Sequence, residues 1–205
     1  MSHVVLLGDS IFDNAAYVPG GPPVIDQVRA ALPADWMASL LAVDGDTTEM
    51  VAVRLQDLPT DATHLVVSVG GNDALRHSSL LDEPRNILPD IAEARAAFAG
   101  RYRKMLDAVL KHNRPTAVCT VYDSVPGLTP AAKAALATFN DIIFREAVRA
   151  GLPVLDLRLL CNDPTDYSDV SPIEPSVRGG EKIADLIAGV VTGHDFARRW
   201  CVVYG

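Results

Sequence analysis

Val4-Val5-Leu6-Leu7-Gly8-Asp9-Ser10 is the stretch that decides the fold. Its first four residues form a short, continuous apolar run, which is typical of a buried parallel strand. Functional side chains in an open α/β sheet lie just past the carboxyl ends of the strands, so Ser10 is placed where a nucleophile would lie. The alternative is that Ser10 caps the following helix, as serines after strands often do.

The rest of the chain alternates further strands with helices. Strands are expected at 36–43, 64–69, 116–122 and 154–157, and helices at 24–32, 49–58, 91–112, 129–150 and 176–197. Thr129 is expected to cap its helix, with Pro130 at the first helical position and Gly151 at the end. This alternation predicts a doubly wound parallel sheet with helices on both faces, and a single domain over residues 1–205.

Composition and charge restrict the partners. The chain has 205 residues, 49% of them hydrophobic, and a net charge of -8, which disfavours nucleic acid and anionic membrane surfaces. No apolar stretch approaches the roughly 20 residues of a membrane span, and the N-terminus has no basic region or cleavage site of a signal peptide. Cys119, Cys161 and Cys201 are widely spaced and are expected to be reduced, buried thiols. A cytoplasmic protein is therefore expected.

Small and polar residues follow three successive strands. They are Gly8-Asp9-Ser10, Asp44-Gly45-Asp46 and Gly70-Gly71-Asn72-Asp73. A serine that attacks an ester needs hydrogen-bond donors directed at the developing oxyanion. The backbone N–H groups of Gly45 and Ser10 and the side-chain amide of Asn72 are suitable donors. Their occurrence together at three strand ends favours a catalytic role over three ordinary turns.

With these motifs the chain resembles the SGNH hydrolases, the superfamily that includes the GDSL esterases. Gly8-Asp9-Ser10 matches the first block, with Ile11 where many members have Leu, and Gly45 and Gly70-Gly71-Asn72-Asp73 match the second and third blocks. The resemblance implies Ser10 as nucleophile, with Gly45 and Asn72 completing the oxyanion hole. The implied fold is a flavodoxin-like three-layer α/β/α sandwich with a five-stranded parallel sheet.

The fourth catalytic block departs from the family pattern. Members carry Asp-x-x-His followed by Pro, whereas this chain has Ser171-Pro172-Ile173-Glu174-Pro175. Ser171 therefore stands at the Asp position and Glu174 at the His position. We expect Glu174 to act as the general base, because a buried carboxyl can acquire the necessary basicity. Ser171 is a suitable companion, since it is neutral and can donate a hydrogen bond.

The five histidines offer one alternative base. His3 and His64 are expected at the opposite end of the sheet, and His112 and His194 late in helices. His77 follows the third strand end and lies at the correct face, as an alternative base or a substrate contact.

Further acidic residues lie near these motifs. Asp166 and Asp169 share the loop of Glu174 and are candidates for orienting a group of the site. Asp9 and Asp73 are expected to hold loops through hydrogen bonds to the backbone. The sequence has no phosphate-binding, dinucleotide-binding or zinc-protease motif, so no cofactor and no metal are implied.

Three functions fit these observations. The first is hydrolysis of a small-molecule carboxylic ester, small or acyl, through a Ser10 acyl-enzyme with Glu174 as base. The second is a binding or regulatory module that has lost its base, and the third is acyl transfer on the same fold. The loops at 12–23 and 75–89 are expected to shape the substrate pocket, but they identify no natural substrate or acyl chain length. The sequence gives no indication of the oligomeric state.

Overall fold

The fold is built on one parallel sheet. A computed structural model describes residues 1–79 and 87–205. Six strands pair in the order β2-β1-β3-β4-β5-β6, and every pair is parallel. The strands are β1 (Ser2–Gly8), β2 (Trp36–Leu40), β3 (His64–Ser68), β4 (Thr116–Cys119), β5 (Val154–Leu155) and β6 (Val203–Tyr204). The predicted α/β class is confirmed.

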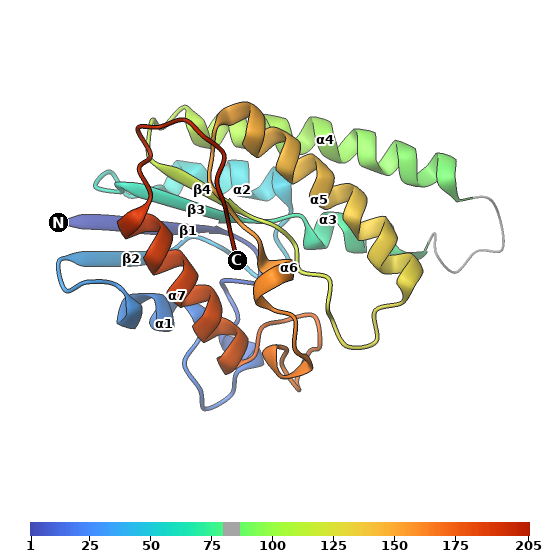
Figure 1. The fold of residues 1–205 in the computed structure, drawn as a ribbon, viewed down its shortest axis with the longest axis horizontal. Coiled ribbons are helices and arrows are strands. Elements are labelled where there is room, and N and C mark those ends of the chain that lie inside the picture. Colours follow the sequence, from blue (N-terminus) through green and yellow to red (C-terminus); the bar gives the residue numbers. More distant parts are fainter. Residues whose placement is uncertain (80–86) are drawn as a thin grey trace.

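Helices cover both faces of this sheet (Figure 1). They are α1 (Val24–Ala31), α2 (Thr48–Arg54), α3 (Gly71–Leu75), α4 (Leu88–Leu110), α5 (Pro130–Ala150), α6 (Leu157–Leu160) and α7 (Val177–Gly193), with short 3-10 turns at Ala15–Tyr17, Leu55–Asp57 and Pro164–Asp166. Helices α1 and α7 lie against one face, and α2, α4 and α5 lie against the other (Figure 1). Within the described ranges, no helix is long and apolar enough to cross a bilayer.

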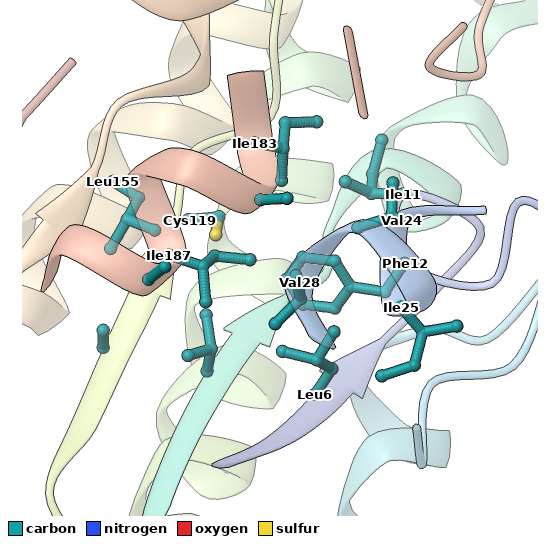
Figure 2. Close-up of a cluster of buried hydrophobic side chains, with 14 of the residues drawn as sticks. Leu6, Ile11, Phe12, Val24, Ile25, Val28, Cys119, Leu155, Ile183 and Ile187 are labelled. Atoms are coloured by element: carbon teal, nitrogen blue, oxygen red, sulfur yellow. The ribbon is translucent and has the colours of Figure 1, made fainter. Parts of the chain in front are cut away.

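The first strand shows why a continuous apolar run forms a central strand. Val4 and Leu6 belong to the hydrophobic cluster on the α1 and α7 face, whereas Val5 and Leu7 belong to the cluster on the opposite face. All four side chains are fully buried, because successive residues of a strand point to opposite sides and both sides are covered. Figure 2 shows Phe12 packed within the cluster on the α1 and α7 face.

The prediction of five strands is wrong by one. The sixth strand, β6, pairs with β5 through Val203 and Tyr204, and the backbone N–H of Asp156 donates to the carbonyl oxygen of Tyr204 at 2.7 Å. Helix α7 ends at Gly193 instead of continuing to residue 197, which leaves enough chain to return to the sheet. A two-residue strand has no periodicity of its own, so only its tertiary pairing defines it.

Several predicted boundaries shift by a few residues, and one helix is confirmed at both ends. The Thr129 hydroxyl accepts a hydrogen bond from the N–H of Ala132, Pro130 is the first residue of α5, and Gly151 ends it in the left-handed conformation. The expected strands at 36–43, 116–122 and 154–157 stop at Leu40, Cys119 and Leu155. Part of the expected loop at 75–89 belongs to α4, and residues 80–86 lie outside the described residues.

Gly8 lets the first and third strands end side by side. Its φ is +142°, and a Cβ atom at this position would lie 1.8 Å from the carbonyl oxygen of Ser68. Any other residue would therefore push β1 away from β3. Because the strands are parallel, the segments that follow β1, β2 and β3 meet at one edge of the sheet.

Candidate active site

Ser10 lies in a tight turn directly after β1. The backbone N–H groups of Phe12 and Asp13 both donate to the carbonyl oxygen of Asp9 at 3.1 Å, and the N–H of Asp9 donates to Ser68. No helix begins at Ser10, since the next helical turn is preceded by Asn14. The capping alternative for Ser10 is therefore wrong. Ser10 is buried but lines a pocket, so its hydroxyl group can meet a ligand there.

The carboxyl group of Asp9 holds this turn from inside the protein. One oxygen, Oδ1, accepts a hydrogen bond of 3.2 Å from the N–H of Ile11. Asp73 has a similar role, because its carboxylate accepts from the N–H of Thr48 at 3.0 Å and from the Thr48 hydroxyl at 2.9 Å. The prediction that both acids hold loops is confirmed. The pKa of Asp9 is raised to about 8, mainly by burial and to a smaller extent by the charge of Glu174.

Glu174 lies in a loop fixed from several sides. Its own N–H donates to the carbonyl oxygen of Ser171 at 3.0 Å, and its carbonyl oxygen accepts from the N–H of Ser168 at 2.8 Å. The Tyr122 hydroxyl donates to the carbonyl oxygen of Ile173 at 2.7 Å. These contacts hold the backbone on both sides of Glu174, and the residue is only 4% exposed.

The structure places Ser10 and Glu174 in the lining of one pocket. Burial is the main cause that raises the pKa of Glu174, to about 7, while a hydrogen-bonding interaction with the Ser10 side chain lowers it. The charge of Asp44 raises the same pKa. One carboxylate oxygen of Glu174, Oε2, is buried without a hydrogen-bond partner among the described residues. A carboxyl group with a pKa near neutrality, next to a serine hydroxyl, has the properties of a general base.

The expected hydrogen bond from the Ser171 hydroxyl to the Glu174 carboxylate is not formed. Ser171 contacts Glu174 through its backbone carbonyl oxygen, and Oε2 of Glu174 lacks a partner within the described part of the chain. Asp166 does not orient Glu174 either, because its carboxylate is held by Lys182 at 2.7 Å. Asp169 is exposed in the same loop.

Gly45 and Asn72 are linked to each other through one turn. The side-chain amide of Asn72 donates to the carbonyl oxygen of Asp46 at 3.0 Å, which fixes the side chain while leaving its second N–H available. Gly45, between Asp44 and Asp46, has a φ of +83° that favours glycine. The N–H of Asp44 donates to Asp13 at 3.0 Å, so this turn is also tied to the loop after Ser10.

A pocket of about 170 Å³ lies beside Ser10. Ser10, Asn72 and Glu174 line it together with many apolar side chains from α3, α4, α5 and the segment 121–128. Gly45 is exposed and is not among the lining residues. The contribution of α5 was not predicted from the sequence, although Ala132 and Ala135, three residues apart in the expected helix, were a signal for open space beside one face.

His3 and His64 lie at the amino ends of β1 and β3 as predicted, whereas His112 and His194 follow α4 and α7 instead of lying within them. His77 lines the pocket, and its ring lies 6.4 Å from that of Phe139. The other four lie outside it. His3 Nε2 contacts the Ser39 hydroxyl at 2.8 Å, and His3 Nδ1 lies 3.1 Å from the Asp61 carboxylate, which forms a serine–histidine–aspartate arrangement near the amino end of β1. This second arrangement is remote from the strand ends that carry Ser10 and Asn72.

The fold and the residues at these strand ends define a hydrolase of the SGNH type. The model of the GDSL-like Lipase/Acylhydrolase family matches residues 6–181, and the chain therefore belongs to this family. Membership of the family supports ester hydrolysis in general. This chain departs from the family's Asp-x-x-His pattern, because it has Ser171 and Glu174 at those two positions. No curated protein sequence matches the chain.

Solved structures with the same fold include lipases and acetyl xylan esterases. The lipase Lip_vut3 from a goat rumen metagenome has a TM-score of 0.74 and 17% identity, and the match covers 90% of this chain and 95% of that one. An extracellular lipase from Streptomyces rimosus has a TM-score of 0.68 and 18% identity, covering 94% and 99%. A variant of the acetyl xylan esterase Axe2 from Geobacillus stearothermophilus has a TM-score of 0.64 and 15% identity, covering 89% and 91%. At these identities the neighbours establish the fold alone.

Proposed function

We propose that this protein hydrolyses carboxylic esters through an acyl-enzyme at Ser10, with Glu174 in place of histidine as the general base. The observation that carries the proposal is the buried Glu174 carboxyl group, which interacts with the Ser10 side chain and has a pKa of about 7. Family membership supports the reaction class. We also propose that residues 1–205 form a single domain, because one sheet carries a hydrophobic cluster on each of its faces.

A glutamate can replace the histidine because its basicity is adjustable. In water, Glu is weaker than His by about 2 pKa units, or about 3 kcal/mol of proton-transfer driving force. A pKa of about 7 gives Glu174 the basicity of an ordinary histidine and so removes this difference. A histidine base becomes a cation that an aspartate stabilises, whereas a glutamate base becomes neutral when it accepts the proton. The neutral Ser171 at the aspartate position fits a base that never carries positive charge.

The acylation step follows from this arrangement. The Glu174 carboxylate takes the proton of the Ser10 hydroxyl as Oγ attacks the ester carbonyl carbon. The N–H groups of Ser10 and Gly45 and the amide of Asn72 stabilise the oxyanion of the tetrahedral intermediate. As the intermediate collapses, Glu174 gives the proton to the departing alcohol oxygen, and the acyl group stays on Ser10.

Deacylation repeats the sequence with water. Glu174, again a carboxylate, takes a proton from a water molecule that attacks the acyl carbon. The same donors stabilise the second oxyanion, and Glu174 returns the proton to Ser10 Oγ as the carboxylic acid is released. The proposal requires a small-molecule ester and no cofactor.

We also propose a cytoplasmic location, which the three unpaired cysteines support. Cys119 and Cys161 are buried as expected, whereas Cys201 is only half-buried.

A p-nitrophenyl acetate assay of the wild type beside Ser10→Ala tests this function. Ser10→Ala should lower kcat by on the order of 1,000-fold or more, because the covalent step is lost, while the melting temperature stays close to that of the wild type. Ser39→Ala is the matched control, because Ser39 also faces a histidine but lies outside the site. Equal turnover by Ser10→Ala and wild type, or a loss confined to Ser39→Ala, would contradict the assignment.

A further inference from the structure

The pocket beside Ser10 has an uneven chemical character. Ser10, Asn72 and Glu174 contribute the reactive polar groups, while most of the remaining lining residues described by the structure are apolar. Two large apolar side chains of the lining, Leu75 and Ile173, are themselves 47% and 39% exposed. An apolar pocket with a few convergent polar groups is the usual form of a small-molecule site.

We propose that this pocket binds the acyl chain of a medium-chain ester, with about six carbons in the chain. The proposal rests on the proposed function, because it assigns the group that is attached to the carbonyl carbon attacked by Ser10. It specifies the length of the acyl chain, which neither the family description nor the names of the structural neighbours give.

Small residues on α5 create the space. Ala132 and Ala135 line the pocket at a spacing of three residues, so they occupy the same face of the helix. Ala134, between them, is exposed to solvent and does not line the pocket. Ala94 of α4 and Ala74 of α3 also contribute to the lining. Larger side chains at these positions would occupy the space that we assign to the acyl chain.

The surroundings of Glu174 distinguish the acyl group from the alcohol. Glu174 gives its proton to the alcohol oxygen, so the alcohol leaves from the side of this carboxyl group. On that side lies Asp44, which is exposed, acts on Glu174 through its charge and accepts a hydrogen bond of 2.7 Å from the Tyr17 hydroxyl. This polar rim suits an alcohol in contact with water. The apolar pocket is left for the acyl chain.

The size of the pocket sets the chain length. An apolar protein cavity of about 150 Å³ holds benzene, a six-carbon ligand. The pocket here measures about 170 Å³. Each buried methylene group contributes about fourfold to kcat/KM. A hexanoyl ester has four more methylene groups than an acetyl ester, so its kcat/KM should be higher by on the order of 100-fold. Chains much longer than the pocket should show no further gain.

Two isomeric esters test the orientation. Ethyl hexanoate and hexyl acetate have the same atoms and similar hydrophobicity, but they place the six-carbon chain on opposite sides of the ester. Ethyl hexanoate should be hydrolysed with a kcat/KM at least tenfold higher. Equal values, or a preference for hexyl acetate, would overturn the assignment of the pocket to the acyl chain.

Matched alanine substitutions on α5 test the location. Ala135→Leu should lower the ratio of kcat/KM for p-nitrophenyl hexanoate to that for p-nitrophenyl acetate by at least tenfold, and Ala134→Leu should leave this ratio unchanged. Ala132→Val adds only two methyl groups and serves if Ala135→Leu does not fold. An unchanged ratio in the folded pocket variants would overturn the proposal.

A binding measurement separates this inference from the proposed function. Hexanamide is neutral and unreactive, and its saturable binding to Ser10→Ala can be followed by NMR. We expect such binding, and we expect Ala135→Leu to weaken it in the Ser10→Ala background. If hexanamide binds while the wild type hydrolyses no ester, the pocket stands and the hydrolase proposal fails. If esters are hydrolysed without chain preference and hexanamide does not bind, the pocket assignment is overturned.

Discussion

Glu174 and Ser10 line the same pocket, although the two residues come from opposite ends of the chain, and the Ser10 side chain lowers the pKa of Glu174. Backbone hydrogen bonds on either side fix the loop of Glu174, and the turn after β1 fixes Ser10. Burial keeps the pKa of the Glu174 carboxyl group at about 7, so a proton can move between the two side chains near neutral pH. The chemistry proposed for this protein depends on that relationship.

Asp44→Asn should move the acidic limb of the pH profile of kcat/KM to lower pH. The charge of Asp44 raises the pKa of Glu174, so its removal lowers this pKa and leaves the base ionised in more acidic solution. The amide oxygen of Asn can still accept the hydrogen bond from Tyr17. The profile of kcat/KM reports the free enzyme and is the quantity to measure. Asp35→Asn, just before the amino end of β2, is the control. An identical shift of the limb in both variants would contradict a specific effect of the Asp44 charge on the pKa of Glu174.

His77→Gln should leave the midpoint of that limb in place, near the Glu174 pKa of about 7. His77 lines the pocket, so the rate itself can change while the titrating group stays the same. The temperature dependence of the midpoint gives an independent check, because ionisation of a carboxyl group has a much smaller enthalpy than ionisation of an imidazole. A midpoint that vanishes in His77→Gln would identify the histidine as the base.

Asn72→Ala should lower kcat by about 100- to 1,000-fold with a smaller change in KM, as for other oxyanion donors. The amide of Asn72 is held by the carbonyl oxygen of Asp46, so it is already oriented before substrate binds. Steady-state kinetics on a p-nitrophenyl ester measure both constants, with the exposed Asn162→Ala as control. A change confined to KM would mean that Asn72 only binds the substrate.

The stability of the protein should fall as pH rises towards 8, and Asp9→Asn should reduce this fall. Burial raises the pKa of Asp9 from 3.8 to about 8, so the folded protein retains a proton that the unfolded chain loses. The stabilisation is complete below pH 3.8 and is lost as the pH rises through about 8. An Asn side chain keeps the acceptor for the N–H of Ile11 and cannot ionise.

Urea unfolding at pH 5 and pH 9 measures this effect. The difference in the free energy of unfolding between wild type and Asp9→Asn should change by on the order of 1 kcal/mol or more between the two pH values, in favour of Asp9→Asn at pH 9. Parallel curves for the two proteins would show that Asp9 does not titrate in this range.

Local patterns made much of the fold predictable. The apolar run before Gly8 specifies a strand buried on both faces, and Thr129, Pro130 and Gly151 specify both ends of α5. The polar residues after β1 and β3 meet because parallel strands carry their carboxyl ends to one edge.

Features that arise only from tertiary packing were not predictable. The two residues of β6 form a strand only because β5 offers a free edge, and no local pattern marks them. Leu75, His77 and Ser78 of the expected loop at 75–89 line the pocket, but none of its described lining residues comes from the expected loop at 12–23. The alanines of α5 line it because of where the helix packs. The Ser171 hydroxyl had the right chemistry to contact Glu174, but the turn between them is closed by backbone atoms instead.

The central claim is that Glu174 is the base for Ser10, and Glu174→Gln tests it most directly because it keeps the size of the side chain and removes its basicity. We predict that kcat for a p-nitrophenyl ester falls by about 100- to 10,000-fold at pH 8, with the acidic limb of the profile lost. The double variant Ser171→Asp/Glu174→His, which restores the family pattern, should regain activity with a limb set by the imidazole. A Glu174→Gln variant with the full activity and the pH profile of the wild type would contradict the account.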